Sequence, residues 1–128
     1  MTVSENLPAW FSKSLAVVPE SKTIDVGGVA IHSLRWGTDT SKPGVIFVHG
    51  NGAHAHWWSF IAPFFLDHYR AIAIDLAGAG DSGASNGYTP EAFAAQINAV
   101  ADDAGFGADT IIVGHSFGGY ITLKTGLL

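Results

Sequence analysis

Ser116 has the neighbours that a serine needs in order to act as a nucleophile. It lies in the segment Gly114–Gly119, which reads G-H-S-F-G-G and follows the β-branched apolar run 111–113. A serine hydroxyl is a weak nucleophile that must be presented and activated. A G-x-S-x-G nucleophile elbow presents it on a strained turn from a strand into a helix. The apolar residues on both sides predict this context, so Ser116 is the candidate nucleophile, although the five residues alone would also fit a glycine-rich loop.

The residues around Ser116 also predict how negative charge on a substrate would be stabilised. A helix that begins near Phe117 would direct its free N–H groups and its positive dipole end toward a developing oxyanion. Gly114 and Gly118 leave room for neighbouring backbone to pass close to the turn. Together these residues indicate nucleophilic attack on a carbonyl group.

The composition is that of a core-forming globular chain of at most one domain. The 128 residues are 48% hydrophobic and 13% charged, with 6 basic and 11 acidic side chains and a net charge of −5. This charge argues against nucleic acid as a partner and weakly against an anionic membrane. The lack of cysteine excludes disulfides and thiolate chemistry. No apolar run approaches the ~18 residues of a membrane span and residues 1–10 lack signal-peptide features, so we expect a cytoplasmic protein without membrane contact.

Buried strands and helices alternate along most of the chain. A Gly27-Gly28 turn predicts an initial hairpin, and the continuous apolar runs that follow are typical of strands buried on both faces. The expected strands span residues 23–26, 29–36, 45–48, 71–74 and 111–114. The expected helices span 8–15, 56–67, 90–104 and the residues from 117 on, and Pro63 is a point at which the second of them can kink or split. This order predicts an α/β fold, in which an antiparallel hairpin is followed by parallel strands with helices on both faces. Loops at the carboxyl ends of such strands form the active site, and three loops qualify: 49–56, 75–83 and 114–119.

In three places the sequence resembles the N-terminal half of the α/β-hydrolase fold family. Residues 47–52 read F-V-H-G-N-G and are similar to the family's His-Gly oxyanion loop. Residues 75–83 read D-L-A-G-A-G-D-S-G and are similar to its D-x-x-G-x-G-x-S loop, where the family often has Pro and His in place of Ala77 and Ala79. The elbow is the third match. The resemblance covers residues from about 22 to 128, so we expect residues 1–128 to form one partial domain of this fold.

The resemblance implies a role for each of these segments. Ser116 would be the nucleophile of a serine hydrolase, and the backbone N–H groups of Asn51 and Phe117 would form its oxyanion hole. Gly50 and Gly52 would let the oxyanion loop approach the substrate. The implied substrate is a small molecule with a carboxylic ester, thioester or related acyl bond, and neither a cofactor nor a metal is implied. Serine in place of aspartate argues against the members that open epoxides or cleave haloalkanes. Hydrolysis of amides, lactones or carbon–carbon bonds and cofactor-free perhydrolysis stay open.

One part of the family pattern has no counterpart in the sequence. The family's triad runs Ser, then Asp or Glu, then His. Lys124 is the only charged residue after Ser116, and no histidine follows it. We therefore expect a fold truncated after the elbow, with the strand at 110–114 left as an apolar edge that pairs with a missing C-terminal half or with a second copy. The alternative function is a catalytically inactive remnant, or a binding module that keeps the first half of the fold.

Two other patterns suggest different chemistry and are weaker. Residues 78–83 fit the dinucleotide fingerprint G-x-G-x-x-G, but that site needs a helix directly on the glycines, and the next helix signal comes several residues later. His54 and His56 are spaced like metal ligands but have no third partner at a recognisable spacing. Both are poor candidates for the general base, because base geometry is demanding. The resemblance implies structural or pocket-lining roles for His49 and His115.

Overall fold

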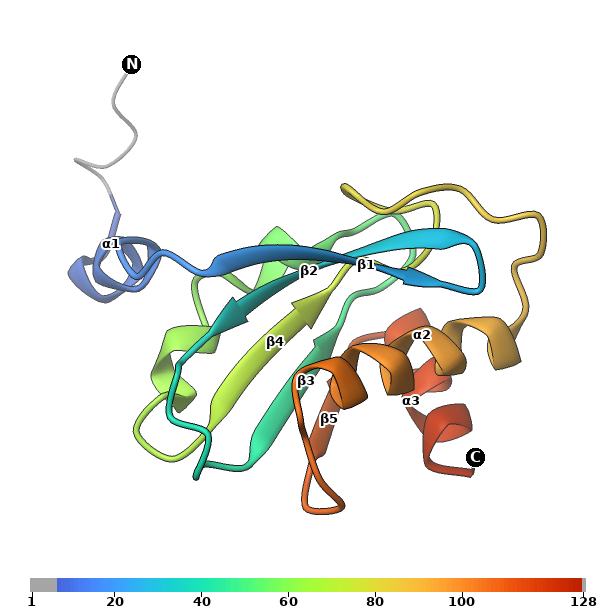
Figure 1. The fold of residues 1–128 in the computed structure, drawn as a ribbon. Helices are drawn as coiled ribbons and strands as arrows, with labels where there is room; N and C mark the ends of the chain where they lie inside the picture. The colour runs from blue at the N-terminus through green and yellow to red at the C-terminus, as the bar shows by residue number, and fades with distance from the viewer. Residues whose placement is uncertain (1–6, 128) are drawn as a thin grey trace.

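One five-stranded sheet organises the protein. A computed structural model describes residues 7–127. Its elements in chain order are α1 (Ala9–Leu15), β1 (Glu20–Val26), β2 (Val29–Trp36), β3 (Gly44–Val48), the 3₁₀ turns η2 (Ala55–Trp58) and η3 (Ala62–Phe65), β4 (Arg70–Ile74), α2 (Pro90–Asp103), β5 (Ile111–Gly114) and α3 (Phe117–Leu127). Helices α2 and α3 lie together beside the sheet (Figure 1).

The strands are arranged in the order β1-β2-β4-β3-β5. β2 runs antiparallel to both β1 and β4, whereas β3 runs parallel to both β4 and β5. The predicted α/β fold, with an antiparallel hairpin followed by parallel strands, is therefore confirmed. The hairpin lies at one edge of the sheet, and the strand that leads into the elbow lies at the other.

Two apolar cores flank the sheet, and side-chain alternation along each strand supplies both. In β3, Ile46 and Val48 face the core that holds α2 and α3, whereas Val45 and Phe47 face the core that holds η2 and η3. Phe47 stacks on Trp58 of η2 with ring centroids 5.0 Å apart. Burial on both faces explains why this strand is a continuous apolar run.

Helix α2 begins at the residues that the sequence indicated. Thr89 caps it by accepting a hydrogen bond from the Ala92 N–H at 3.1 Å, and Pro90 occupies the first turn, where its missing N–H costs nothing. The helix buries Phe93, Ile97 and Val100 against the sheet. Its start fixes where Phe93 lies relative to the candidate site.

The segment 56–67 is divided near Pro63, as the sequence allowed, but the α-helical type predicted for it is wrong. The structure instead has the two short 3₁₀ turns η2 and η3 in this segment. Pro63 lies in the first turn of η3, and its missing N–H and fixed φ prevent a continuous helix from passing through it. The apolar residues of the segment still pack on the sheet, so the periodic pattern indicated burial correctly and the helix type incorrectly.

Strand β5 lies at the edge of the sheet, as predicted, and pairs with β3 alone among the described strands. Its first residue, Ile111, is 45% exposed. Pairing of this edge with a further segment or a second copy stays a prediction. Within residues 7–127, no helix has both the length and the hydrophobicity required to cross a bilayer.

Candidate active site

The carboxyl ends of the three parallel strands lie side by side. Val48 at the end of β3 is paired with Ile74 of β4 on one side and with Gly114 of β5 on the other. The loops that follow these residues therefore leave the sheet at the same edge. These are the three loops that the sequence predicted to form the site.

Ser116 has a strained backbone. Its φ of 56° is the only positive value among the described residues that are not glycine. Such a conformation costs about 1–3 kcal/mol and persists only where the surroundings enforce it. Here the N–H of His115 donates to the Val48 carbonyl at 3.1 Å, and the Ser116 carbonyl accepts from the N–H of Tyr120 at 3.2 Å. The turn between β5 and α3 is thus hydrogen-bonded to the end of β3 and to the first turn of α3, and the Ser116 side chain is exposed.

Two glycines allow this turn to pack. A Cβ atom on Gly114 would overlap the carbonyl oxygen of Gly118 and the hydroxyl of Thr122. A Cβ atom on Gly118 would overlap the carbonyl oxygens of Val48 and His49. Because most of these atoms belong to the backbone, neither clash can be relieved by a change of rotamer. Gly114 is therefore required for the close contact of β5 with α3, and Gly118 for the close contact of α3 with the end of β3.

Gly50 and Gly52, in the loop that follows β3, are required for two different physical reasons. A Cβ on Gly50 would lie 3.2 Å from His115 Nδ1 and 3.5 Å from Ser116 Cβ, so this residue sets how closely the loop approaches the elbow. Gly52 faces open space but has a φ of 77°, which disfavours other residues. Asn51 lies between them and is itself exposed.

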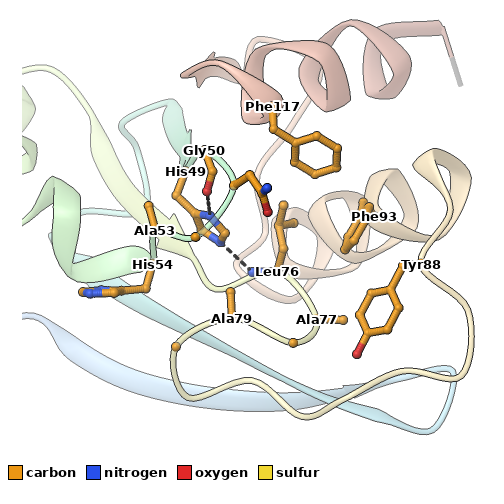
Figure 2. A pocket seen from close by; sticks show the side chains of 14 residues that line it. His49, Gly50, Ala53, His54, Leu76, Ala77, Ala79, Tyr88, Phe93 and Phe117 are labelled. Atoms are coloured by element: carbon orange, nitrogen blue, oxygen red, sulfur yellow. Dashed lines mark hydrogen bonds between the residues drawn. The ribbon is translucent and has the colours of Figure 1, made fainter.

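The two predicted oxyanion donors have no acceptor within the described part of the chain. Neither the Asn51 N–H nor the Phe117 N–H donates to a described protein atom. Phe117 is the first residue of α3, where a helix leaves its N–H groups unsatisfied. Both residues line a pocket of about 580 Å³ (Figure 2). Their assignment as oxyanion donors stays a prediction that this arrangement supports.

His49 is held in one tautomer by two backbone groups, which Figure 2 shows as dashed lines. Its Nδ1–H donates to the Gly50 carbonyl at 2.8 Å, and its Nε2 accepts from the Leu76 N–H at 3.1 Å. Burial of the ring lowers the pKa of His49, against the Gly50 hydrogen bond, which raises it. With both nitrogens occupied, His49 cannot take a proton from Ser116 and instead ties the oxyanion loop to the loop after β4.

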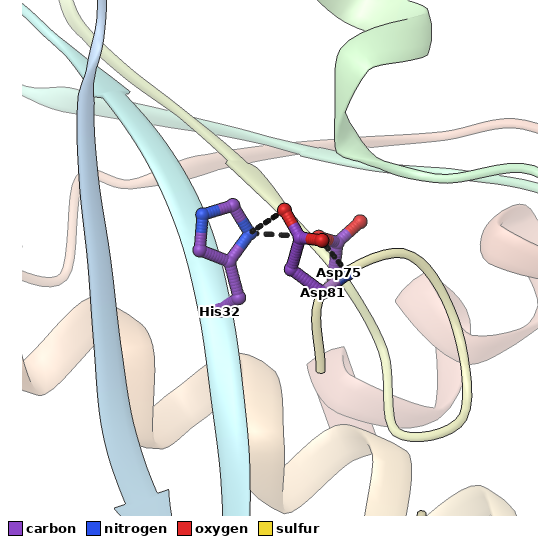
Figure 3. A group of neighbouring side chains, drawn as sticks. All are labelled: His32, Asp75 and Asp81. Atoms are coloured by element: carbon purple, nitrogen blue, oxygen red, sulfur yellow. Dashed lines mark hydrogen bonds and ion pairs between the residues drawn. The ribbon is translucent and has the colours of Figure 1, made fainter. Parts of the chain in front are cut away.

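A second buried histidine forms the most extensive polar cluster near the site (Figure 3). His32 on β2 donates from Nδ1 to Asp75 Oδ2 at 2.7 Å, and its Nε2 lies 2.6 Å from the Ser21 hydroxyl. Asp75 Oδ1 accepts from the Ala55 N–H at 2.6 Å, and Oδ2 also accepts from the Asp81 N–H at 3.1 Å. The Asp75 carboxylate therefore connects β2 to the loops that follow β3 and β4.

The same cluster has the donor set of a metal site, because oxygen and nitrogen atoms of His32, Asp75 and Asp81 lie within 4.8 Å of one another. Its buried atoms, however, are already satisfied by one another and by backbone N–H groups. A cation would have to displace the His32 proton that holds Asp75. The arrangement is that of a structural hydrogen-bond network.

Ser116 shares a smaller pocket with two of the remaining histidines. His54, His115 and Trp57 line this space of about 380 Å³ together with Ser116. Across residues 7–127, the Ser116 hydroxyl makes no hydrogen bond to any side chain. An activated nucleophile requires such a bond to a base, and no described imidazole provides it.

The segments that form this site match one known family. Residues 45–128 match the Alpha/beta hydrolase family. The chain belongs to the alpha/beta hydrolase family.

Within the alpha/beta hydrolase family the chain is similar to enzymes of differing chemistry. An esterase of Mycobacterium tuberculosis is 34% identical over 84% of the chain. Epoxide hydrolase 1 of Caenorhabditis elegans is 30% identical over 80% of the chain. The structure of a thioesterase domain from the curacin biosynthetic pathway superposes with a TM-score of 0.73 at 29% identity and covers 84% of the chain.

The chain spans only part of each of these proteins. It covers 34% of the length of the esterase, 26% of the epoxide hydrolase and 40% of the thioesterase domain. The similarity therefore establishes the hydrolase family and the fold of this region, whereas the reaction and substrate are matters for a proposal.

The structure brings all the predicted site segments to one edge of the sheet. Ser116 and Phe117 come from the elbow, and Asn51 comes from the oxyanion loop beside it. Sequence reasoning missed His32, whose partner Asp75 is 43 residues away along the chain. Only the pairing of β2 with β4 makes the two neighbours, and no motif in the sequence signals it.

Proposed function

We propose that this chain carries the nucleophile and the oxyanion hole of a serine hydrolase that cleaves carboxylic esters or related acyl bonds. One observation carries the proposal: an exposed serine at a φ of 56° lies between two segments whose backbone N–H groups have no acceptor among the described residues. A strained, exposed residue beside unsatisfied donors is expected where a ligand completes the hydrogen bonding.

In the proposed reaction, Ser116 Oγ forms a bond to the acyl carbon of the substrate, and the carbonyl electron pair moves onto oxygen. The N–H groups of Asn51 and Phe117 stabilise this oxyanion, and the loss of one such donor typically costs ~10²–10³ in rate. Collapse expels the alcohol or thiol, which takes up a proton. Water then forms a bond to the acyl carbon, the acyl–Oγ bond breaks, the carboxylic acid leaves, and a proton returns to Ser116 Oγ.

The proton of Ser116 must pass to a base. We assign this base to a histidine outside residues 7–127, because His49 is committed to two backbone groups and the other described imidazoles make no hydrogen bond to the serine. The chain covers 34% of the esterase it resembles, which leaves room for such a residue in a longer protein.

Serine at the elbow favours acyl chemistry over epoxide opening, although epoxide hydrolases are among the relatives. A serine that opened an epoxide would become an ether, which water does not cleave under mild conditions. An acyl group on the same oxygen is an ester, which water does cleave. The esterase relative and the thioesterase structure agree with this choice.

A second candidate function is a non-catalytic binding module that retains the fold. The unpaired Ser116 hydroxyl favours it, since a serine without a base is a weak nucleophile.

Treatment with a fluorophosphonate probe separates the two functions. Attack by Ser116 Oγ on phosphorus displaces fluoride and leaves a stable adduct, which mass spectrometry can locate. With imidazole added in solution as an external base, we expect labelling at Ser116 that Ser116→Ala abolishes and that Ser85→Ala, at a half-buried serine outside the elbow, leaves intact. A folded chain that stays unlabelled under all conditions would support the binding module.

A further inference from the structure

An exposed serine far from the elbow in sequence is bonded to the buried histidine of the His32–Asp75 cluster. The Ser21 hydroxyl on β1 lies 2.6 Å from His32 Nε2, and His32 Nδ1 lies 2.7 Å from Asp75 Oδ2. Hydroxyl, imidazole and carboxylate are thus connected in series, which is the order in which a base and its orienting acid activate a serine. The reaction proposed at Ser116 uses none of these three side chains.

The direction of both hydrogen bonds follows from the carboxylate. Ionised Asp75 can only accept, so the proton between it and His32 belongs to Nδ1, and Nε2 of the neutral imidazole is left as an acceptor. The bond between Ser21 and His32 is therefore donated by the serine hydroxyl. A proton that leaves Ser21 has its acceptor already in place, at hydrogen-bond distance.

The imidazole of His32 is held in this orientation from several sides. Its side chain is 4% exposed and that of Asp75 is 1% exposed. The His32 N–H donates to Ser82 Oγ at 2.8 Å, and the His32 carbonyl accepts from the Asp75 N–H at 2.9 Å. The other Asp75 oxygen accepts from the Ala55 N–H. A base held in this way needs no rearrangement before it takes up a proton.

Two carboxylates stabilise the imidazolium that forms when His32 takes up a proton. Asp75 is in direct contact with Nδ1, and Asp81 Oδ2 lies 4.0 Å from the same atom (Figure 3). The Asp81 side chain is 73% exposed, so water screens its charge and the buried Asp75 contributes more. The cluster therefore favours the charged form of the base that transfer from Ser21 would produce.

Ser21 lies on an edge strand, where a reagent can reach it. Thr23 is paired with His32, and Ser21 with Leu34 two positions further on. The N–H and carbonyl of His32 are both bonded on the side away from β1, so Thr23 and His32 form a pair without mutual hydrogen bonds. Because such pairs alternate along an antiparallel ladder, the N–H of Ser21 also points away from β2.

The free edge supplies a donor as well as access. Ser21 is exposed, and its outward N–H can donate to an oxyanion on the carbon that its Oγ attacks, as a nucleophilic serine's own N–H does in a protease oxyanion hole. Ser21 lines neither of the two pockets at the elbow. The reactivity of the leaving group, and not the shape of an acyl pocket, would therefore determine which acyl donors react there.

We propose that Ser21 is a second nucleophile of this chain, activated by His32 and Asp75, and that it accepts small acyl groups from activated esters. Ser21 Oγ forms a bond to the acyl carbon while its proton passes to His32 Nε2. The bond between the acyl carbon and the leaving oxygen breaks, and the alcohol or phenol leaves with that proton. Water then attacks the acyl carbon, the carboxylic acid leaves, and a proton returns to Oγ.

An aryl acetate tests this proposal without added imidazole, because the base at Ser21 is part of the protein. The full chain is incubated with p-nitrophenyl acetate and quenched with acid at a series of times. Mass spectrometry locates each acetyl group, and the release of p-nitrophenolate is followed in parallel. Ser41 is the internal control, because it is exposed and its hydroxyl donates directly to the Asp39 carboxylate at 2.6 Å, without an imidazole. Ser21 is expected to be acetylated at least ~10²-fold faster than Ser41.

Hydroxylamine separates acetylation of Ser21 from acetylation of its neighbour Lys22. It cleaves the acetyl ester of a serine and leaves the acetyl amide of a lysine intact. We expect a hydroxylamine-sensitive acetyl group that Ser21→Ala removes, together with a fall in p-nitrophenolate release in that variant. An acetyl group on Lys22 alone, with release unchanged in Ser21→Ala, would overturn the proposal.

His32→Gln tests the base. The substitution keeps a polar side chain in the cluster and removes the proton acceptor, so acetylation of Ser21 should fall at least ~10²-fold while acetylation of Ser41 stays the same. Circular dichroism shows whether the variant is folded. An unchanged rate at Ser21 in folded His32→Gln would overturn the proposal. If the variant does not fold, the unmodified chain decides, and equal rates at Ser21 and Ser41 would overturn it.

The result is separable from the outcome of the fluorophosphonate experiment. Acetylation of Ser21 needs no added base, whereas labelling of Ser116 is expected to need imidazole, and the two adducts lie on different parts of the chain. Labelling at Ser116 without fast acetylation of Ser21 would keep the hydrolase proposal and remove the second nucleophile. Fast acetylation of Ser21 without labelling at Ser116 would remove the hydrolase proposal and keep the second nucleophile.

Discussion

Two polar regions lie at the same edge of the sheet and differ in how completely their groups are satisfied. In the His32–Asp75 cluster the side chains are buried, and each oxygen and nitrogen has a partner within the protein. At the elbow, Ser116 is exposed and strained, and the N–H groups of Asn51 and Phe117 have no acceptor among the described residues. The difference indicates that the first region holds the loops in place, whereas the polar groups of the second region are available to bind a ligand.

The largest effect is expected from removing Asp75. Asp75→Ala would leave His32 and the Ala55 N–H buried without a partner, so we expect a loss of about 3–5 kcal/mol in the free energy of unfolding. Urea unfolding followed by circular dichroism would measure it. Asp81→Ala is the matched control, because the Asp81 side chain is 73% exposed and only its backbone N–H contacts Asp75. Equal losses for the two variants would contradict the structural role of the cluster.

The next effect tests the packing of the elbow. Gly118→Ala would drive a methyl group into the carbonyl oxygens of Val48 and His49, so we expect a loss of about 3 kcal/mol. Gly119→Ala places the same methyl group on the next residue, where the nearest atom is 3.6 Å away, and should be neutral or stabilising. Thermal unfolding of the two variants would separate them. A stable Gly118→Ala protein would show that the elbow is looser than described.

A smaller effect, a dependence of the free energy of unfolding on pH, is expected from His49, because burial lowers the pKa of its imidazole. The unfolded chain, in which the pKa is near 6.5, then binds the proton more readily than the folded chain. The stability that His49 contributes is therefore present above about pH 6.5 and falls as the pH is lowered through that value and beyond, with a slope of at most about 1.4 kcal/mol per pH unit.

The slope from His49 is separable from that of the carboxylates. Asp39, Glu91 and Asp103 also have lowered pKa values, but they are acids whose ordinary values are 3.8, 4.5 and 3.8, so their contributions are lost at lower pH. Urea unfolding between about pH 7.5 and 5 should show a slope that His49→Gln reduces. An unchanged slope in that variant would assign the effect to other groups.

The smallest effect tests the strain at Ser116. Glycine adopts a φ of 56° at little cost, so Ser116→Gly should raise the free energy of unfolding by about 1 kcal/mol while removing the hydroxyl. Ser116→Ala keeps the strain and should leave stability nearly unchanged. If both substitutions destabilise the chain equally, the serine contributes contacts that the structure does not contain.

The two regions also differ in how far the sequence could predict them. The elbow is local in sequence, because a strand, a turn and a helix follow one another between residues 111 and 127, and their positions were predicted correctly. The position of loop 49–56 next to it was also predicted correctly, since parallel strands end at the same edge.

The His32–Asp75 cluster could not be predicted, because its two residues become neighbours only through the antiparallel pairing of β2 with β4. The helix expected over residues 56–67 failed for a local reason. Apolar spacing indicated burial and Pro63 indicated a break, but the spacing did not distinguish two 3₁₀ turns from α-helix. The pocket of about 580 Å³ beside Phe117 likewise depends on how far α2 lies from the loop after β4, which no motif specifies.

The most direct test of the central claim is whether an added base activates Ser116. If the serine is correctly presented beside two free N–H donors and lacks only a base, imidazole in solution should accelerate fluorophosphonate labelling in proportion to its free-base concentration. The adduct should lie on Ser116, and Ser116→Ala should abolish it. A folded chain whose Ser116 stays unlabelled at every imidazole concentration would contradict the account.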